Sequence, residues 1–324
     1  MKISRRRFLG FASLSLCVIA TRFANGSNIK AGLATRSDRD IDIIGNFHYV
    51  YDNPAYRREF LNFLANVFHL YPQDALHALI TSTRQRHDND QDIYRQLQNN
   101  ITDIKPFLAD LTYALPALIK QKTVMTEQTK AILPKHNFDG YLELGSTGRY
   151  LDSLEEVLDI SGEFFFISER QDGYSLTDML DRGQINKAGR WLDLNNYRTE
   201  IAGTIAPRSI ELATVYIGFH HCPPALRASF IGSIRDTLKP GGSLILRDHD
   251  AHNEKMQHMV ALAHDVFNMG TMESWAYNDA ERRHFYSLAE LDSMMKQFGF
   301  KANGKRLLQT GDPTRNTLMH FVKI

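Results

Sequence analysis

The chain has little cysteine, almost no net charge and no long apolar run. It holds 2 cysteines among 324 residues, and Cys17 lies in a segment that we expect to be removed, so no internal disulfide is expected. A net charge of +1 gives no electrostatic reason to expect nucleic acid as a partner. No apolar run reaches the ~18 residues that a membrane helix needs, so no transmembrane span is expected. With 43% hydrophobic residues, the chain has the composition of a globular protein of one large or two modest domains.

Glycine is missing where two common nucleotide sites would require it. The stretch Tyr141–Tyr150 has the pattern of a buried strand, a turn and a helix start, with Gly145 and Gly148 in the turn. A dinucleotide fingerprint would need glycine where Thr147 stands, and no Gly-Lys-Ser/Thr follows to make a phosphate loop. Glu143 lies just before the turn, where its carboxylate can meet a ligand amine or brace the loop.

Residues 1–26 have the pattern of a targeting segment. Basic residues at Arg5–Arg7 precede the apolar run Phe8–Ala20, which is too short to span a membrane. Ser4–Leu9 resembles the twin-arginine export motif, which implies the twin-arginine export machinery as a partner and a periplasmic or exported protein. If the signal is not functional, the protein is expected in the cytoplasm. A plain basic tail is the alternative interpretation.

The front half of the chain, residues 40–135, carries helical patterns and no chemical motif. One apolar stripe has helical spacing and consists of Phe60, Phe63, Leu64, Val67 and Phe68. We interpret this region as a helical cap domain beside a second domain. Closure over a substrate, a structural role and a partner-binding role all fit such a cap.

From Phe138 onward, predicted strands and helices alternate, which favours an α/β fold with a mostly parallel sheet and helices on both faces. The strands are expected near residues 141–144, 162–169, 189–193, 209–218, 243–248, 305–309 and 317–324. The main helices between them are expected at residues 150–158, 175–183, 225–238, 251–266 and 287–298.

Polar residues collect where these strands end. Glu169 ends the second predicted strand, in the place where a carboxylate accepts hydrogen bonds from a ribose diol. Asp193 ends the third strand, Phe219-His220-His221 follows the fourth, and Asp248-His249 follows the fifth. Ligands of open α/β sheets bind at this edge.

These elements together resemble the class I S-adenosylmethionine-dependent methyltransferases. Glu143 and Gly145 match their first motif, and Leu238-Lys-Pro-Gly-Gly242 before a strand is frequent among them. The resemblance covers residues 136–324 and implies a Rossmann-like seven-stranded sheet closed by an antiparallel hairpin. It also implies S-adenosylmethionine as cofactor and a small-molecule methyl acceptor. The cofactor residues that it implies are Glu143, Gly145, Ser146, Gly148, Glu169, Asp193 and Phe219.

Methyl transfer to a hydroxyl or an amine needs alignment and a base, and a neutral histidine is suited to removing the proton. The predicted catalytic residues are His220, His221, Asp248 and His249. A packed turn that only shapes the pocket is the alternative for the two adjacent histidines.

A metal site is the other interpretation of this region. Its ligands would come from His220, His221, Cys222, Asp248, His249, Asp250 or His252. Adjacent histidines point apart and no i, i+4 pair exists, so no metal is assigned from the sequence.

Two other functions stay open. An oxidoreductase with another nucleotide cofactor is disfavoured by the missing glycines. An exported, non-catalytic binding module on a degenerate methyltransferase fold is favoured by Thr147 and Arg149 in the glycine turn.

Overall fold

The computed structural model describes residues 45–106, 113, 115–171, 173–175, 178–179, 188–199, 201 and 203–324. The predicted targeting segment, residues 1–26, lies outside these ranges, as does most of the helix predicted at residues 175–183. No helix within the described ranges is both long enough and apolar enough to cross a membrane.

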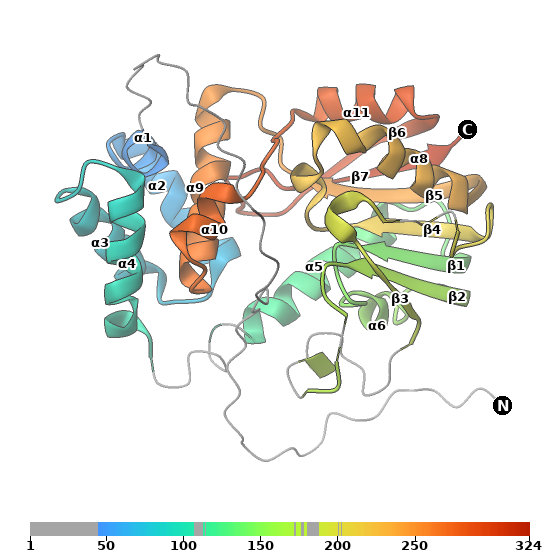
Figure 1. Ribbon diagram of the computed structural model, residues 1–324, viewed down its shortest axis with the longest axis horizontal. Helices are drawn as coiled ribbons and strands as arrows, with labels where there is room; N and C mark the ends of the chain where they lie inside the picture. The colour runs from blue at the N-terminus through green and yellow to red at the C-terminus, as the bar shows by residue number, and fades with distance from the viewer. Residues whose placement is uncertain are drawn as a thin grey trace.

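The core of the protein is a seven-stranded sheet in the order β3-β2-β1-β4-β5-β7-β6 (Figure 1). The first five strands pair in parallel, and β7 runs antiparallel to both β5 and β6. The strands are β1 (Asn137–Leu144), β2 (Asp159–Ser168), β3 (Arg190–Asp193), β4 (Ile210–Val215), β5 (Leu238–Asp248), β6 (Phe300–Leu308) and β7 (Thr317–Lys323). The expected α/β sheet with its closing antiparallel hairpin is therefore confirmed.

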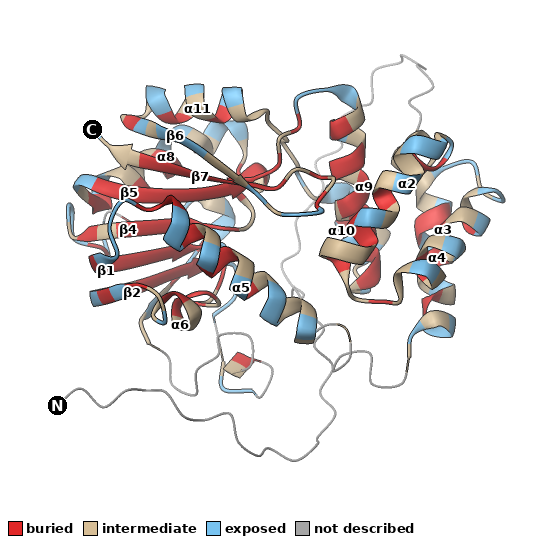
Figure 2. Cartoon of the chain, turned by 180° about the vertical axis from the view of Figure 1, so that it is seen from behind, coloured by how far each residue is buried: buried red, intermediate tan, exposed pale blue. Residues whose placement is uncertain are grey.

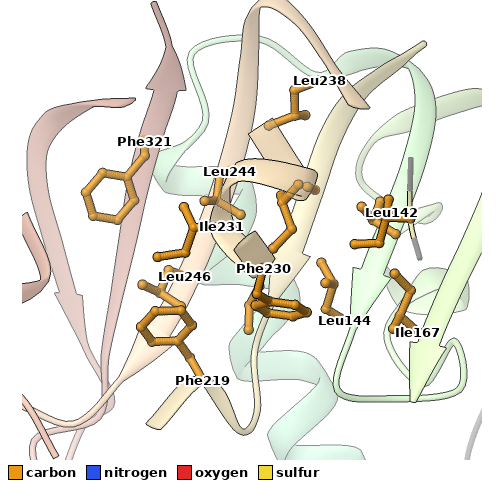
Figure 3. Close-up of a cluster of buried hydrophobic side chains, with 14 of the residues drawn as sticks. Leu142, Leu144, Ile167, Phe219, Phe230, Ile231, Leu238, Leu244, Leu246 and Phe321 are labelled. Carbon is orange, nitrogen blue, oxygen red and sulfur yellow. The ribbon is translucent and has the colours of Figure 1, made fainter. Parts of the chain in front are cut away.

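Alternation along the central strands explains why the sheet is covered on both faces. Leu142 and Leu144 of β1 point into one apolar cluster, whereas Tyr141 belongs to another. Because successive side chains of a strand point to opposite faces, a continuous apolar run gives the strand an apolar side chain on each face, and both faces are then buried. Figure 3 shows part of the first cluster, where Phe230 and Ile231 of a covering helix meet Leu244 of β5.

Helices cover both faces of the sheet. One face carries α8 (Arg227–Thr237) and α11 (Leu288–Gln297). The opposite face carries α5 (Leu115–Ile132) and the single turn α6 (Leu151–Leu154). The helix predicted at residues 150–158 is thus shorter than expected, because residues 155–158 form the turn that leads into β2 at Asp159.

A helical layer lies beside the sheet (Figures 1 and 2). Its elements are α1 (Asn46–Tyr51), α2 (Pro54–Phe63), the π-helical turn η1 (Leu64–Phe68), α3 (Gln73–Arg84), α4 (Asp90–Ile104), α9 (Glu254–Gly270) and α10 (Trp275–Ala280). The stripe predicted around Phe60 is buried in the apolar cluster of this layer.

The division of the chain between the two layers does not follow the sequence order. Helix α5 lies within the predicted cap, residues 40–135, but packs Met125 and Ile132 against the sheet. Helix α9 comes from the second half of the chain, and its Met259, Leu262 and Val266 pack into the helical layer. Helix α9, which follows β5, therefore joins the carboxyl ends of the parallel strands to the helical layer.

Candidate functional site

The predicted site residues come together at the carboxyl edge of the parallel strands. Glu143 lies in β1, Glu169 directly follows β2, and Asp193 ends β3. The short turn η4 (Phe219–His221) follows β4, and Asp248 ends β5. Parallel strands with a shared direction bring these ends to one edge, as expected.

Glu143 is fully buried and braces the turn after β1. Its carboxylate accepts hydrogen bonds from the Tyr141 hydroxyl at 2.8 Å, from the Ser146 hydroxyl and from the backbone N–H of Tyr150 at 3.4 Å. Burial raises the pKa of Glu143, while these three donors act in the opposite direction. Of the two roles that the sequence left open, the structure shows the bracing role for Glu143.

The two glycines of the turn are required by its own packing. Gly145 has φ +85°, and a Cβ there would lie 2.3 Å from the carbonyl oxygen of Ile217. Gly148 has φ +91°, and its Cβ would meet the ring of Phe166 at 3.0 Å. Only glycine adopts this backbone region without strain, so both residues keep the turn tight against β4 and β2.

The ends of β2 and β3 present two exposed carboxylates side by side. The register pairs Ser168 with Asp193, which places Glu169 next to that strand end. The Glu169 carboxylate accepts a hydrogen bond from the N–H of Asn196 at 3.3 Å, and Asp193 accepts one from the N–H of Asn195 at 2.9 Å. Partial burial raises the pKa of Glu169. Both carboxylates keep acceptor capacity for a ligand.

The segment that follows β3 has a strained backbone. Asn195, Asn196 and Tyr197 have φ values of +46°, +51° and +66° in succession. Non-glycine residues adopt this region at a cost of about 1–2 kcal/mol each, and such strain concentrates at functional sites. The Tyr197 hydroxyl donates to the carbonyl oxygen of Gly218, which ties this segment to the turn after β4.

Phe219, a predicted cofactor residue, packs into the interior. It is 2% exposed and belongs to the apolar cluster between the sheet and α8 (Figure 3). In this structure its ring contributes packing that holds η4 in place.

His220 and Asp248 form a buried pair across the ends of β4 and β5. The distance from His220 Nδ1 to Asp248 Oδ1 is 2.8 Å, and the same oxygen accepts the N–H of His249 at 2.8 Å. Burial acts to raise the pKa of Asp248, but the charges and hydrogen bonds of His220 and His249 outweigh it and lower the pKa. A carboxylate at Nδ1 holds the proton on that nitrogen, so Nε2 of His220 keeps its lone pair.

Two more imidazoles lie against His220. His249 makes a 3.0 Å contact from its Nδ1 to the carbonyl oxygen of Thr314, which fixes its proton in the same way. The rings of His249 and His264 lie 5.6 and 4.8 Å from that of His220, and Phe285 packs against all three. Burial and then the neighbouring His220 lower the pKa of His249 to about 4, and the same two causes lower the pKa of His264.

His221 contacts the segment of the chain that covers the site. Its Nδ1 lies 2.9 Å from the carbonyl oxygen of Arg282, and His284 donates its N–H to the carbonyl oxygen of His220 at 2.8 Å. The extended segment 281–286 is thereby fixed over the ends of β4 and β5. Burial, followed by the neighbouring His220, lowers the pKa of His221 to about 4.

The other residues considered for chemistry have local roles. Cys222 is buried, and burial raises the pKa of its thiol to about 12, so the reactive thiolate is disfavoured. Asp250 accepts a 3.2 Å hydrogen bond from the N–H of Leu288 at the start of α11. His252 is exposed and contacts the carbonyl oxygen of Asp250 at 3.0 Å.

Sequence reasoning missed His264 and Phe285. His264 lies 15 residues beyond His249 along the chain, in the middle of α9, with no local motif around it. One signal was present: Val260 and His264 are four residues apart, and so His264 shares the helix face that buries Val260 against Phe285.

No protein-family model matches the chain, and no curated protein matches it. Among solved structures, the 1,6-didemethyltoxoflavin-N1-methyltransferase of Burkholderia thailandensis, which carries bound S-adenosylhomocysteine, is 10% identical. That match covers 71% of this chain and 87% of the other, with a TM-score of 0.41. An S-adenosylmethionine-dependent methyltransferase of Mesorhizobium loti is 11% identical over 61% of this chain and 96% of its own, with a TM-score of 0.43. A third such methyltransferase, from Methanosarcina mazei, is 17% identical. That match covers 61% of this chain and 97% of the other, with a TM-score of 0.40. Likeness at this level assigns no activity to the chain.

Proposed function

We propose that the protein is an S-adenosylmethionine-dependent methyltransferase that acts on a small-molecule acceptor. The observation that carries the proposal is the pair of exposed carboxylates, Glu169 and Asp193, on adjacent strand ends next to the glycine turn of β1. An acidic residue at the end of the second strand suits a ribose diol, since each carboxylate oxygen accepts more than one hydrogen bond.

The residues present fit the cofactor on its nucleoside side. Glu169 would accept from the ribose hydroxyls, and Asp193 would accept from the adenine amino group. The methionine side would meet the backbone of the turn at Gly145 and Gly148, since the carboxylate of Glu143 is already engaged by Ser146 and its neighbours. When bound, the cofactor supplies an electrophilic methyl group on a sulfonium.

On the acceptor side, the chain provides the histidine pair at the ends of β4 and β5. The Asp248 carboxylate holds the His220 proton on Nδ1, so Nε2 is free to accept a proton from an acceptor hydroxyl or amine. Segment 281–286 covers these groups and keeps water from them, which strengthens the electrostatic interactions inside. His221 and His249 flank the pair and shape the space around it.

The direct test is the substitution Glu169→Ala with Glu163→Ala as a matched control. Glu163 lies on the same strand, away from its carboxyl end, with a side chain that is 66% exposed. We expect Glu169→Ala to weaken S-adenosylmethionine binding by about 1–3 kcal/mol in calorimetric titration, and Glu163→Ala to leave it unchanged. Equal affinity in wild type and Glu169→Ala would remove the ribose role from Glu169.

One observation favours the binding-module alternative. The Glu143 carboxylate is satisfied within the turn, and Thr147 and Arg149 occupy positions where glycines would leave the backbone bare. A folded protein that binds no S-adenosylmethionine would support that alternative.

We also propose, from residues 1–26 alone, export through the twin-arginine machinery. Lysines in place of Arg5 and Arg6 should retain the protein in the cytoplasm, as followed by cell fractionation with an unmodified chain as control. Unchanged export of the lysine variant would reject the motif.

A further inference from the structure

Three imidazole nitrogens meet in a buried space between the sheet and the helical layer. His220 comes from η4 after β4, His249 follows β5, and His264 projects from α9. One ligand nitrogen of each lies within 4.8 Å of those of the other two. A general base requires one such nitrogen, whereas three together are the donor set of a metal ion.

The hydrogen bonds at two of these rings each engage one nitrogen and leave the other available as a ligand. Nδ1 of His220 is held by Asp248 and Nδ1 of His249 by the carbonyl oxygen of Thr314, so each ring keeps an unprotonated Nε2. Nε2 of His220 is buried and has no hydrogen-bond partner among the described residues. A buried acceptor without a partner destabilises the folded state, and this cost is removed when an ion binds there.

We propose that His220, His249 and His264 bind one divalent transition-metal ion, with zinc as the best fit. Neutral imidazoles suit zinc, and three protein nitrogens with further positions for other ligands are the pattern of catalytic zinc sites. Asp248 would orient His220 from behind, as carboxylates do for metal-bound histidines. Nitrogens on a tetrahedral zinc lie roughly 3.3 Å apart, so the three nitrogens would move closer together when an ion binds.

The surroundings fit a cation that is held by neutral ligands. Asp248 is the buried carboxylate behind the site, and its second oxygen has no hydrogen-bond partner among the described residues. Phe285 packs against the three rings and keeps the site apolar on one side. An ion at this edge would lie on the acceptor side of the proposed enzyme. It would take the lone pair of His220 Nε2, so with the ion bound the acceptor would be activated by the ion and not by that nitrogen as a base. This placement rests on the proposed function, whereas the binding of the ion does not.

The test is metal titration of the full chain after removal of bound metal with a chelator. We expect one Zn²⁺ per chain by calorimetry and, with Co²⁺, the visible absorption bands of a low-coordinate nitrogen site. Zinc should also raise the melting temperature, because a ligand that binds only the folded state stabilises it.

Variants identify the ligands. His264→Gln and His249→Gln should each weaken Zn²⁺ binding at least about a hundredfold and remove the Co²⁺ bands. His252→Gln, in an exposed histidine nearby, should bind as the wild type does. Circular dichroism and thermal melting of each metal-free variant show whether it folds.

Three results would overturn the proposal: no ion bound by the folded wild type, unchanged affinity in a folded His264→Gln variant, or loss of binding in His252→Gln alone. These titrations contain no S-adenosylmethionine. Failure here therefore leaves the cofactor proposal standing, and failure of cofactor binding leaves the metal site standing.

Discussion

At the residue scale, the turn after β1 shows how one backbone position fixes the ends of neighbouring strands. Gly145 lies against the carbonyl oxygen of Ile217, two residues beyond β4, and its N–H donates to the carbonyl oxygen of Ile167 in β2 at 2.8 Å. The turn therefore contacts both neighbouring strand ends. Displacement of Gly145 would move the ends of three strands relative to one another.

We predict that Gly145→Ala lowers the free energy of unfolding by about 3 kcal/mol, because the residue has a positive φ and the added Cβ would overlap a backbone oxygen. Gly304→Ala is the matched control, with φ +80° and nothing within 4 Å of the added Cβ, and should cost about 1 kcal/mol. Denaturant unfolding measures both. Equal losses in the two variants would mean that the contact with Ile217 has no energetic weight.

The sequence predicted individual residues unevenly. Glu169 and Asp193 were predicted correctly as strand-end carboxylates, because a strand and its end can be recognised from an apolar run followed by polar residues. The bracing of Glu143 by Ser146 and the meeting of His264 with His220 depend on side-chain directions and on a distant helix. Local patterns carry neither kind of information.

At the scale of elements, α9 links the sheet to the helical layer. Asp265 of α9 accepts hydrogen bonds from Arg283 and Asn278 at 2.8 Å each, and from Asn46 of α1 at 2.9 Å. This buried carboxylate is thus shared by α9, α1, α10 and the segment that covers the histidines. An aspartate buried together with an arginine is retained only when both are hydrogen-bonded.

Helix α1 is capped by a second carboxylate near the first. Asp90 accepts the N–H groups of Asn46 and Phe47 at 2.6 and 3.3 Å. Burial, and then the charge of Asp265, raises the pKa of Asp90 to about 6 despite these bonds. The folded state therefore binds the proton of Asp90 more tightly than the unfolded chain does.

This shift predicts a pH dependence of stability. The contribution of protonated Asp90 to the free energy of unfolding is fully present below about pH 4 and is lost as the pH rises through about 6. The difference in unfolding free energy between wild type and Asp90→Asn should therefore change by about 2 kcal/mol between pH 4 and pH 7. Asp88→Asn, an exposed neighbour, is the control. A difference that stays constant with pH in Asp90→Asn would contradict the raised pKa.

The boundaries of the elements were predicted less well than their order. The strand predicted at residues 162–169 begins at Asp159, and the helix predicted at residues 150–158 is a single turn. The order was recoverable because strands buried on both faces give continuous apolar runs. The sequence did not predict that α5 packs with the sheet and α9 with the helical layer, because both helices have apolar faces that would fit either core.

At the scale of the whole molecule, the sheet and the helical layer meet where the strand ends carry their polar residues. The cofactor proposal concerns the ends of β1, β2 and β3, and the metal proposal concerns β4, β5 and α9. The two proposed sites lie on one edge of one sheet, as a transfer reaction between molecules bound there would require. The alternation of strands and helices in the sequence predicted that polar residues would collect at this edge. Only the structure shows that α9 lies beside it.

Calorimetric titration of S-adenosylmethionine into the full chain measures whether the protein binds the proposed cofactor. We predict one site per chain with a dissociation constant in the micromolar range, about −8 kcal/mol, and loss of part of that affinity in Glu169→Ala. NAD under the same conditions serves as the control ligand and should give no heat of binding. A cooperatively folded protein that binds NAD, or that binds neither ligand, would contradict the proposal.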